Sequence, residues 1–359
     1  MDLHVLQSVP PSCLNRDDTG SPKTAVYGGV RRARVSSQSW KRAIRLMFKD
    51  HFGQSELGMR TRYVFDMVAG EIIKASPGVS PEDALNLAKK TLEKVKIKAA
   101  KKDADKSEYL FFLSAQQAKN VAAAALGEVN EKEVKKALQE NNSVELSLFG
   151  RMVADDPELN CDASAQVAHA ISTHQVENEY DYFTAVDDFG ADMQDHAGSG
   201  HLGTIEYNSA TLYRYATVAV HGEQGLYSQL ANDAAALEKA VREFTRAFIC
   251  SIPTGKQNTF AAHTIPHAAL VTVRTDRPLN LVGAFEKPII SKEGFAEKSA
   301  DALVEYTRGA YENFCRKPEI SYVVGEYLSE LGERKPLEDM IGELGREVAR
   351  RAEAERVVT

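Results

Sequence analysis

The sequence has few cysteines and no apolar run long enough to cross a membrane. Its four cysteines are isolated, and no CxxC pair is present; they are Cys13, Cys161, Cys250 and Cys315. Isolated cysteines are typical of free thiols in a reducing compartment. A bilayer-spanning helix needs about 20 apolar residues, and neither such a run nor the apolar core of a signal peptide is found. We therefore expect a soluble cytoplasmic protein with no membrane partner.

The sequence also lacks the short motifs of common enzymes: it contains no GxSxG and no P-loop. His169 and His174 are five residues apart, which on a helix is about 140° past a full turn, so they do not easily share one metal. A divalent cation could be held only if an acidic loop folded around it, with Asp187, Asp188, His196 and His201 as its ligands. Capping and loop-surface roles explain these residues more simply. We expect no enzyme, no cofactor and no metal.

Positive charge is missing from residues 152–213, which contain twelve Asp or Glu, four histidines and no Lys or Arg. We predict a helix over the first part, up to His174. Residues 175–204 show no sustained period but contain four aromatic residues, and long irregular loops are uncommon unless they are functional or disordered. We predict that this segment is an interaction arm.

Positive charge is concentrated instead in residues 16–45, which contain eight Lys or Arg and two Asp, although the whole chain carries a net charge of −7. From Ser36 onward the apolar residues have a helical period, with Ser36 or Ser37 as the cap. The buried face is predicted to consist of Trp40, Ala43, Ile44, Met47 and Phe48. The opposite stripe is predicted to consist of Gln38, Lys41, Arg42 and Arg45.

The residues before this helix alternate as in a strand, which places Arg32 and Arg34 on one face and Arg31 on the other. A tight turn at Gly28-Gly29 leads into the strand. A basic strand that feeds the N-terminus of a helix is suited to bind anions, and several cations together favour a polyphosphate backbone. The alternative is a solvated basic face on an ordinary surface helix.

The coarse pattern mixes strands and helices, which favours an α+β fold. We predict strands at 3–9, 207–220 and 268–275. We predict helices at 59–75, 80–98 with Ser80 as cap, 107–126 with Ser107 as cap, 131–140, 228–250, 293–315 and 335–355. Residues 59–141 have the pattern of a helical insertion, whose cations are mostly interspersed with acids, so we assign no RNA contacts to it.

Several separated blocks resemble the CasC family, which supplies the repeated backbone subunit of the type I-E CRISPR surveillance complex, Cascade. The N-terminal blocks are Leu14-Asn15-Arg16-Asp17-Asp18, Lys23, Tyr27-Gly28-Gly29 and the run from Arg34 to Ala43. The later blocks are Ser147 to Met152, Ala168 to Val176, Phe183 to Asp188, His201 to Thr204 and Lys256 to Thr259. The resemblance spans most of the chain and is weak at about 53–143 and after about 315. The sequence differs from the family pattern at Trp40, where the resemblance leads us to expect a smaller aliphatic residue.

The resemblance implies an RNA-recognition-motif-like palm, helical fingers and a protruding thumb. In this chain the palm corresponds to 1–52 and 142–359, the fingers to 53–141, and the thumb-like arm to 175–206. It also implies a non-cleaving scaffold that binds the CRISPR guide RNA (crRNA). Its partners would be copies of itself, the other Cascade subunits, and target DNA through the guide.

We predict that the basic segment binds the RNA backbone without reading sequence. The residues predicted to contact RNA in this segment are Asn15, Arg16, Lys23, Arg32, Arg34, Ser36, Ser37, Gln38, Lys41, Arg42 and Arg45. The later blocks add Arg151, Met152, His174, Gln175, Phe183, Thr184, Lys256, Gln257 and Asn258. The resemblance implies that Met152 lies beside a displaced base, and Phe183 could stack on one; core packing is the alternative for both.

The acidic arm is expected to dock on the basic palm of the next copy, which would give an open head-to-tail filament. Its subunit contacts are predicted to be Tyr180, Asp187 and Asp188. The alternative functions are a free-standing single-strand RNA-binding protein or a metal-dependent ribonuclease that uses the His/Asp arm. A third alternative is an assembly scaffold without nucleic-acid contact, which would leave the basic segment unexplained.

Overall fold

The computed structural model describes residues 1–127, 130–185 and 201–358. Contacts divide the chain into two compact units. Unit 1 consists of Met1–Ile44, Val167–Thr217 and Thr245–Met340, and unit 2 consists of Arg45–Gln166, Val218–Phe244 and Ile341–Thr359. The predicted palm, fingers and arm follow other boundaries, and that division stays a prediction.

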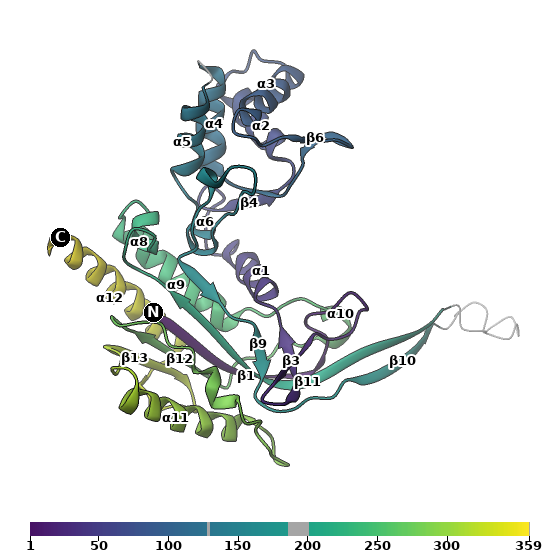
Figure 1. The fold of residues 1–359 in the computed structure, drawn as a ribbon, viewed down its shortest axis with the longest axis vertical. Coiled ribbons are helices and arrows are strands. Elements are labelled where there is room, and N and C mark those ends of the chain that lie inside the picture. The colour runs from purple at the N-terminus through teal and green to yellow at the C-terminus, as the bar shows by residue number, and fades with distance from the viewer. Residues whose placement is uncertain (128–129, 186–200, 359) are drawn as a thin grey trace, which may run out of the picture. The chain divides into compact units, whose positions relative to one another are not determined.

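A large sheet forms the centre of unit 1 (Figure 1). Its strands lie in the order β14, β13, β12, β1, β11, β9, β3, β2, and both β8 and β10 pair with β11 as well. Their bounds are β1 (Asp2–Ser12), β2 (Thr24–Tyr27), β3 (Val30–Val35), β8 (Ala165–Val167), β9 (Ala170–Ser172), β10 (Glu179–Ala185), β11 (His201–Val218), β12 (Ala268–Val273), β13 (Ile320–Gly325) and β14 (Glu333–Arg334). Strands in one sheet mixed with helices confirm the α+β class.

The predicted strands at 3–9, 207–220 and 268–275 are confirmed as β1, β11 and β12, with shifted ends. β1 lies between the other two and runs antiparallel to both. It is buried over most of its length because it has a paired neighbour on each side. β13 was not predicted, because so short a strand gives little local pattern of alternating apolar and polar residues.

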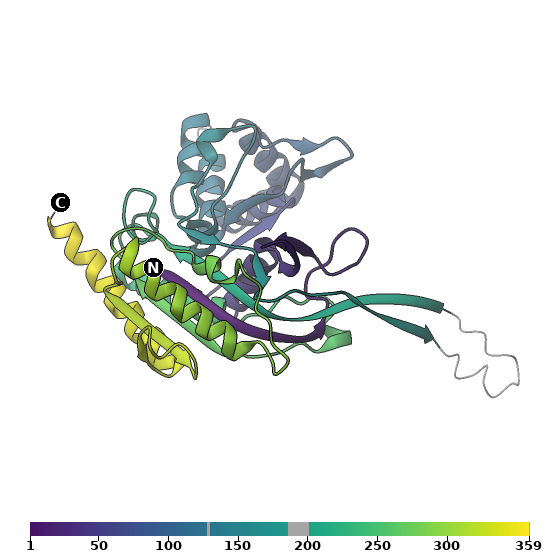
Figure 2. The ribbon, with the colours of Figure 1, turned by 60° about the horizontal axis from the view of Figure 1, so that its bottom comes forward.

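One face of this sheet is covered by α11 (Ala296–Asn313) and η2 (Leu281–Phe285), as Figure 2 shows for α11. Leu6, Leu270 and Leu303 are buried in the core between them. α11 and α12 (Leu337–Val358) confirm the two predicted C-terminal helices. Burying large apolar side chains between a sheet and a helix is the main favourable contribution to such a fold.

The helix that carries the basic stripe, α1 (Ser37–Phe48), is anchored to the sheet by Trp40. The guanidinium of Arg214 in β11 lies 3.7 Å from the centre of the Trp40 ring and donates a 2.6 Å hydrogen bond to Gln7. Trp40 and Arg214 are each 1% exposed, so this cation–π contact is desolvated. The contact explains the tryptophan at this position: a flat ring covers a buried guanidinium better than an aliphatic side chain.

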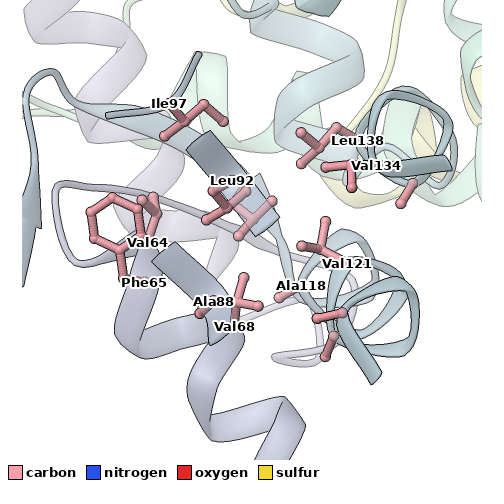
Figure 3. Close-up of a cluster of buried hydrophobic side chains, with 14 of the residues drawn as sticks. Val64, Phe65, Val68, Ala88, Leu92, Ile97, Ala118, Val121, Val134 and Leu138 are labelled. Carbon is pink, nitrogen blue, oxygen red and sulfur yellow. The ribbon is translucent and has the colours of Figure 1, made fainter. Parts of the chain in front are cut away.

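Unit 2 contains a bundle of helices with a continuous apolar core. The helices around this core are α2 (Val64–Ala75), α3 (Pro81–Glu93), α4 (Ala115–Leu126) and α5 (Glu131–Gln139), and unit 2 also contains α6 (Val144–Phe149) and α8 (Leu226–Gln229). Figure 3 shows Phe65, Leu92, Val121 and Leu138 converging in this core. Two small antiparallel sheets accompany the helices: β4 (Gly58–Thr61) pairs with β7 (Phe111–Ser114), and β5 (Ala99–Ala100) forms a hairpin with β6 (Asp103–Ser107).

Several predicted boundaries in this region are confirmed and others are wrong. The side chain of Ser80 caps α3, but the helix ends at Glu93 rather than near 98, because β5 begins shortly afterwards. α4 is capped by Ser114 instead of Ser107, since Ser107 lies in β6. Residues 59–63 precede α2 and are not helical. A residue type that caps helices is common in strands and turns too, so the cap alone did not locate the helix start.

The predicted helix over 152–174 is wrong. This segment forms the short helix η1 (Pro157–Leu159) and the strands β8 and β9. Strand pairing with β11 supplies the hydrogen bonds that a helix would have made internally. The predicted helix at 228–250 is interrupted: Ala231 and Asn232 have φ of 57° and 58°, and α9 (Ala234–Cys250) begins after them. Left-handed residues cannot continue a right-handed helix.

The first part of the predicted arm is regular. β10 pairs with β11 from Glu179↔Tyr207 to Ala185↔His201, and the two strands extend as a ribbon from the sheet (Figures 1 and 2). The sequence suggested an irregular segment, because polar and aromatic residues hide the alternation on a ribbon that is exposed on both faces. Asp187, Asp188 and His196 lie outside the described residues.

Within the described ranges, every helix is too short or too polar to cross a lipid bilayer.

Candidate nucleic-acid interface

The loop after β1 connects the basic residues of unit 1. The side-chain oxygen of Asn15 accepts a 2.9 Å hydrogen bond from the Ser36 backbone N–H, and the Asn15 carbonyl accepts one from Lys23. The Lys23 carbonyl in turn accepts the Arg34 N–H at 2.9 Å. Asp17 closes the loop by accepting hydrogen bonds from Thr19 and from the Ser21 N–H, which leaves its carboxylate engaged within the loop. Asn15 thus joins this loop to the start of α1.

Arg32 cannot serve as a phosphate contact as predicted. It is fully buried, and its guanidinium donates to the carbonyls of Ser172 and Phe285 at 2.9 and 2.8 Å and to that of Tyr27 at 3.2 Å. Burial lowers its pKa. The alternation of the strand could not show that carbonyls from β9 and η2 would surround this side chain. Arg31, which was not among the predicted contacts, is exposed.

Arg34 lies at the start of α1 together with His169, which precedes β9. The Arg34 Nε donates to the Thr24 carbonyl at 3.2 Å, and its Nη1 lies 3.5 Å from His169 Nδ1. The Ser37 backbone N–H donates to the same His169 nitrogen at 3.1 Å. Ser36 is the helix cap, as predicted, because its hydroxyl accepts the Ser39 N–H at 3.3 Å.

Only part of the outer, polar stripe of α1 is exposed for binding a partner. Gln38 and Arg42 are exposed, whereas Lys41 is half-buried and burial lowers its pKa. Arg45 instead forms an ion pair with Glu145 at 2.7 Å. Because Glu145 is almost fully buried and needs that partner, the predicted phosphate contact from Arg45 is not supported by its position.

Lys256 reaches the same region from a distant part of the chain. A Cβ added to Gly255 would lie 2.2 Å from the Leu14 carbonyl oxygen, so this turn packs directly on the loop after β1. Burial raises the pKa of the Cys13 thiol, and the charges of Arg16 and Lys256 both act against that rise. Both cations therefore lie near Cys13.

The two neighbours of Lys256 in the predicted set lie at the start of the one-turn helix α10 (Gln257–Phe260). Asn258 is exposed. Neither polar atom of the buried Gln257 amide has a hydrogen-bond partner among the described residues.

Five of these cations form no ion pair with any carboxylate of the described residues. We call them the basic strip: Arg16, Lys23, Arg34, Arg42 and Lys256. Four of them come from segments of unit 1 that meet around Asn15 and the first turn of α1, and Arg42 lies on the second turn of that helix. Clustered cations repel one another, so this arrangement suits an anionic partner.

Besides Arg45, unit 2 contains two predicted contacts, and these differ. Arg151 is buried, donates to the carbonyls of Leu159, Phe112 and Leu138, and has its pKa lowered to about 10 by burial. It therefore stabilises the fold and is not placed to contact RNA. Met152 is 85% exposed, beside a pocket that Tyr109 and Leu110 also line. Met152 is therefore not a core residue, and the predicted contact with a displaced base stays a prediction.

His174 also has a structural position. Its Nδ1–H donates to the Gln175 carbonyl at 2.8 Å, its Nε2 accepts the Thr211 N–H at 3.1 Å, and its ring stacks on Phe295 at 3.6 Å. Both ring nitrogens are used inside the protein, and burial lowers its pKa. The predicted RNA contact from His174 is therefore not supported, whereas Gln175 is exposed.

The described part of the arm presents aromatic side chains. Tyr180 and Tyr182 are 67% and 64% exposed, and Thr184 is exposed. Phe183 is 38% exposed because its ring packs over Gly203, its partner in β11: a Cβ there would lie 2.3 Å from the ring. Phe183 thus packs within the ribbon while part of its side chain stays exposed. In the described part of the chain, no three His, Cys, Asp or Glu side chains gather as metal ligands.

With this geometry in view, comparisons with known proteins identify the family. The chain belongs to the family of CT1975-like proteins, whose model matches residues 1–345. It is similar to a chain of a solved structure described as "CRISPR RNA-guided surveillance complex, pre-nicking", with 31% identity, a TM-score of 0.80, and coverage of 95% of this chain and 99% of that chain. A chain of another, described as "CRISPR RNA-guided surveillance complex", has 26% identity and a TM-score of 0.72 at the same coverage. Among curated proteins, none matches the sequence.

Sequence analysis did not identify His169 as part of the interface. It lies in one of the blocks that resemble the CasC family, but the sequence pattern tested it only as a metal ligand with His174. The two histidines have different positions: His169 contacts Ser37 and Arg34, while His174 is buried against Phe295.

Proposed function

We propose that this protein is a non-catalytic backbone subunit of a type I-E CRISPR surveillance complex, where it binds the guide RNA along its phosphate backbone. The observation that carries the proposal is the basic strip: five cations from four segments, unpaired with any described carboxylate, around one helix start. The similarity to chains of CRISPR RNA-guided surveillance complexes supports the proposal. In this role unit 1 would be an RNA-recognition-motif-like palm, and the protein would act in the cytoplasm.

The groups of the strip suit phosphates rather than base edges. Arg16, Lys23 and Lys256 are flexible cations, and Asn15 already uses its side-chain oxygen on Ser36. Contacts of this kind position a strand without reading its sequence. Sequence specificity would come from pairing between the guide and target DNA, so the protein must leave the bases accessible.

Assembly would be head to tail, with the arm of one copy on the basic palm of the next. The described arm residues Glu179, Asp181 and Glu206 supply negative charge, and the exposed Tyr180 supplies contact area. A heterologous contact that does not close gives a helical filament, whose ends other Cascade subunits would cover. Reversing the charges of Asp187 and Asp188 should weaken assembly more than RNA binding by a single copy. Equal loss of both would contradict this docking.

The experiment that tests the function is binding of the purified protein to an unstructured, labelled RNA at several salt concentrations. We expect tight binding that is indifferent to sequence, with log K falling by about 0.7 per neutralised phosphate for each tenfold rise in salt. Longer strands should hold larger assemblies. No binding at low salt to any RNA would overturn the proposal.

The same titration with Mg²⁺ or Mn²⁺, followed by inspection of the RNA, addresses catalysis. We expect intact RNA, because the CasC family that the chain resembles is a non-cleaving scaffold. Metal-dependent cutting would favour a ribonuclease. Binding of intact RNA without assembly on longer strands would favour a free-standing RNA-binding protein.

A further inference from the structure

His169 has a defined orientation at the edge of the basic strip. It lies between β8 and β9, and its Nδ1 accepts the Ser37 backbone N–H at 3.1 Å. A nitrogen that accepts a hydrogen bond carries no proton, so the neutral ring has its proton on Nε2. The bond to Ser37 therefore fixes both the tautomer and the plane of the ring.

The surroundings keep this ring neutral. Burial and the charges of Arg34 and Lys23 lower the pKa of His169 below its ordinary value. The groups that face it come from β3, the loop before β2 and the first turn of α1, and none of them is a carboxylate. A protonated ring would point an N–H group at the Ser37 N–H, so the contact itself also disfavours the charged form.

We propose that His169 is an RNA-contact residue whose Nε2–H donates a neutral hydrogen bond to a phosphate oxygen of the strand that the basic strip holds. The proposal rests on the proposed RNA-binding function. The residue is exposed, and it contacts Arg34, so a phosphate bound at Arg34 lies within reach of the ring. Ser37 acts as a positioning residue through its backbone, in addition to any contact from its hydroxyl.

A neutral donor has a distinct signature in a salt titration. Losing a cation that neutralises a phosphate lowers both the affinity and the salt slope, because fewer counterions are released. Losing a neutral hydrogen bond lowers the affinity and leaves the slope unchanged. A typical neutral hydrogen bond contributes about three- to tenfold in affinity.

Two substitutions separate the two nitrogens. In His169→Asn the side-chain oxygen takes the place of Nδ1 and keeps the bond to Ser37, but the outer donor is lost. In His169→Gln the amide reaches the place of Nε2, but the acceptor for Ser37 is lost. We expect H169N to weaken RNA binding about three- to tenfold with an unchanged salt slope and an unchanged urea midpoint. H169Q should recover part of the affinity.

The positioning role of Ser37 is tested by Ser37→Pro against Ser37→Ala. Proline is accepted at the first position of a helix and lacks only the N–H that holds His169. We expect S37P to bind RNA about threefold more weakly than S37A, at equal stability. Equal binding by the two variants would overturn the positioning role.

The outcomes separate this proposal from the proposed function. If the unsubstituted protein binds no RNA, the RNA-binding function fails and this contact fails with it. If it binds RNA and H169N binds equally well, only the His169 contact is overturned. A drop in slope of about 0.7 in H169N would show that His169 binds as a cation, which also contradicts the neutral donor.

Discussion

Lys135 and Lys239 of unit 2 and the cations in the basic strip of unit 1 have opposite surroundings. In unit 2, Lys135 lies 2.8, 3.2 and 2.6 Å from carboxylate oxygens of Glu131, Asp156 and Glu158, and Lys239 lies 2.8 Å from Glu56. In the basic strip, Arg16, Lys23 and Arg34 have no described carboxylate in range. The residue types are the same in both regions. The two sets differ in whether carboxylates lie within ion-pair distance of the cations.

This difference indicates where a partner is needed. Exposed ion pairs contribute only about 0–1 kcal/mol each, so Lys135 and Lys239 are neutralised at little gain in stability. The strip keeps its charges uncompensated, which costs repulsion in the free protein. The proposed polyanion site therefore rests on unpaired cations that separate segments bring together, which a count of charges along the sequence does not reveal.

The largest expected effect separates two arginines that are adjacent in β3. Arg32→Met should lower the free energy of unfolding by about 3 kcal/mol or more, because the buried carbonyls of Ser172 and Phe285 lose their donor. Arg31→Met is the matched control and should change it by less than about 0.5 kcal/mol, because Arg31 is exposed. Urea unfolding of both variants measures the difference. Equal losses would mean that Arg32 is not held by these carbonyls.

Next in size is the loss of strip cations. Lys23→Ala with Arg34→Ala should weaken RNA binding about a hundredfold and lower the salt slope by about 1.4, since two phosphates lose their partners. The matched control removes two paired cations of unit 2, by Lys135→Ala with Lys239→Ala, and should leave both quantities unchanged. If both double variants lose affinity equally, net charge rather than the strip governs binding.

Acid should weaken unit 1 through buried histidines. Burial lowers the pKa of His4 to about 3, and those of His174 and His267 are lowered as well. Above about pH 6.5 these histidines are neutral in both the folded and the unfolded chain, so they do not lower the free energy of unfolding. Below this pH only the unfolded chain takes up protons at these sites, and the free energy of unfolding therefore falls as the pH drops to about 3. His4 alone should account for about 2 kcal/mol between pH 6.5 and pH 5.

Urea midpoints at pH 7 and pH 5 measure this loss. His4→Gln cannot take up the proton, so its midpoint should change less between the two pH values than that of the unsubstituted protein. An equal change would show that other groups cause the acid sensitivity.

The smallest effect comes from giving the strip a carboxylate of its own. Asn15→Asp keeps the oxygen that accepts the Ser36 N–H and adds one negative charge beside Arg16 and Lys23. RNA affinity should fall about tenfold, while stability should rise by up to about 1 kcal/mol, because an acid near a helix N-terminus is favourable. RNA titration and urea unfolding together test the pair of outcomes. A variant that loses stability as well as affinity would show that Asn15 acts through the fold.

The family resemblance could be recognised in the sequence, and the helices and strands with strong local patterns could be predicted from it. The period of α1 from Trp40 to Phe48 and the Ser80 cap of α3 depend on residues a few positions apart, so they are visible without a structure. The same holds for the strand at β1 and the clustering of positive charge before Arg45. Segments with weak local pattern were missed, among them β13, the hairpin of β5 with β6, and the strands within 152–174.

The sequence by itself determined that this chain has an amphipathic basic helix, a strand that feeds it, and an acidic segment without a single Lys or Arg. Only the tertiary structure decided which cations remain available. Arg32 and Arg34 are two residues apart on one strand, yet one is enclosed by carbonyls of β9 and η2 and the other remains at the surface beside His169. The physical reason is that helical period and capping are local, whereas burial and hydrogen-bond partners come from segments more than a hundred residues away.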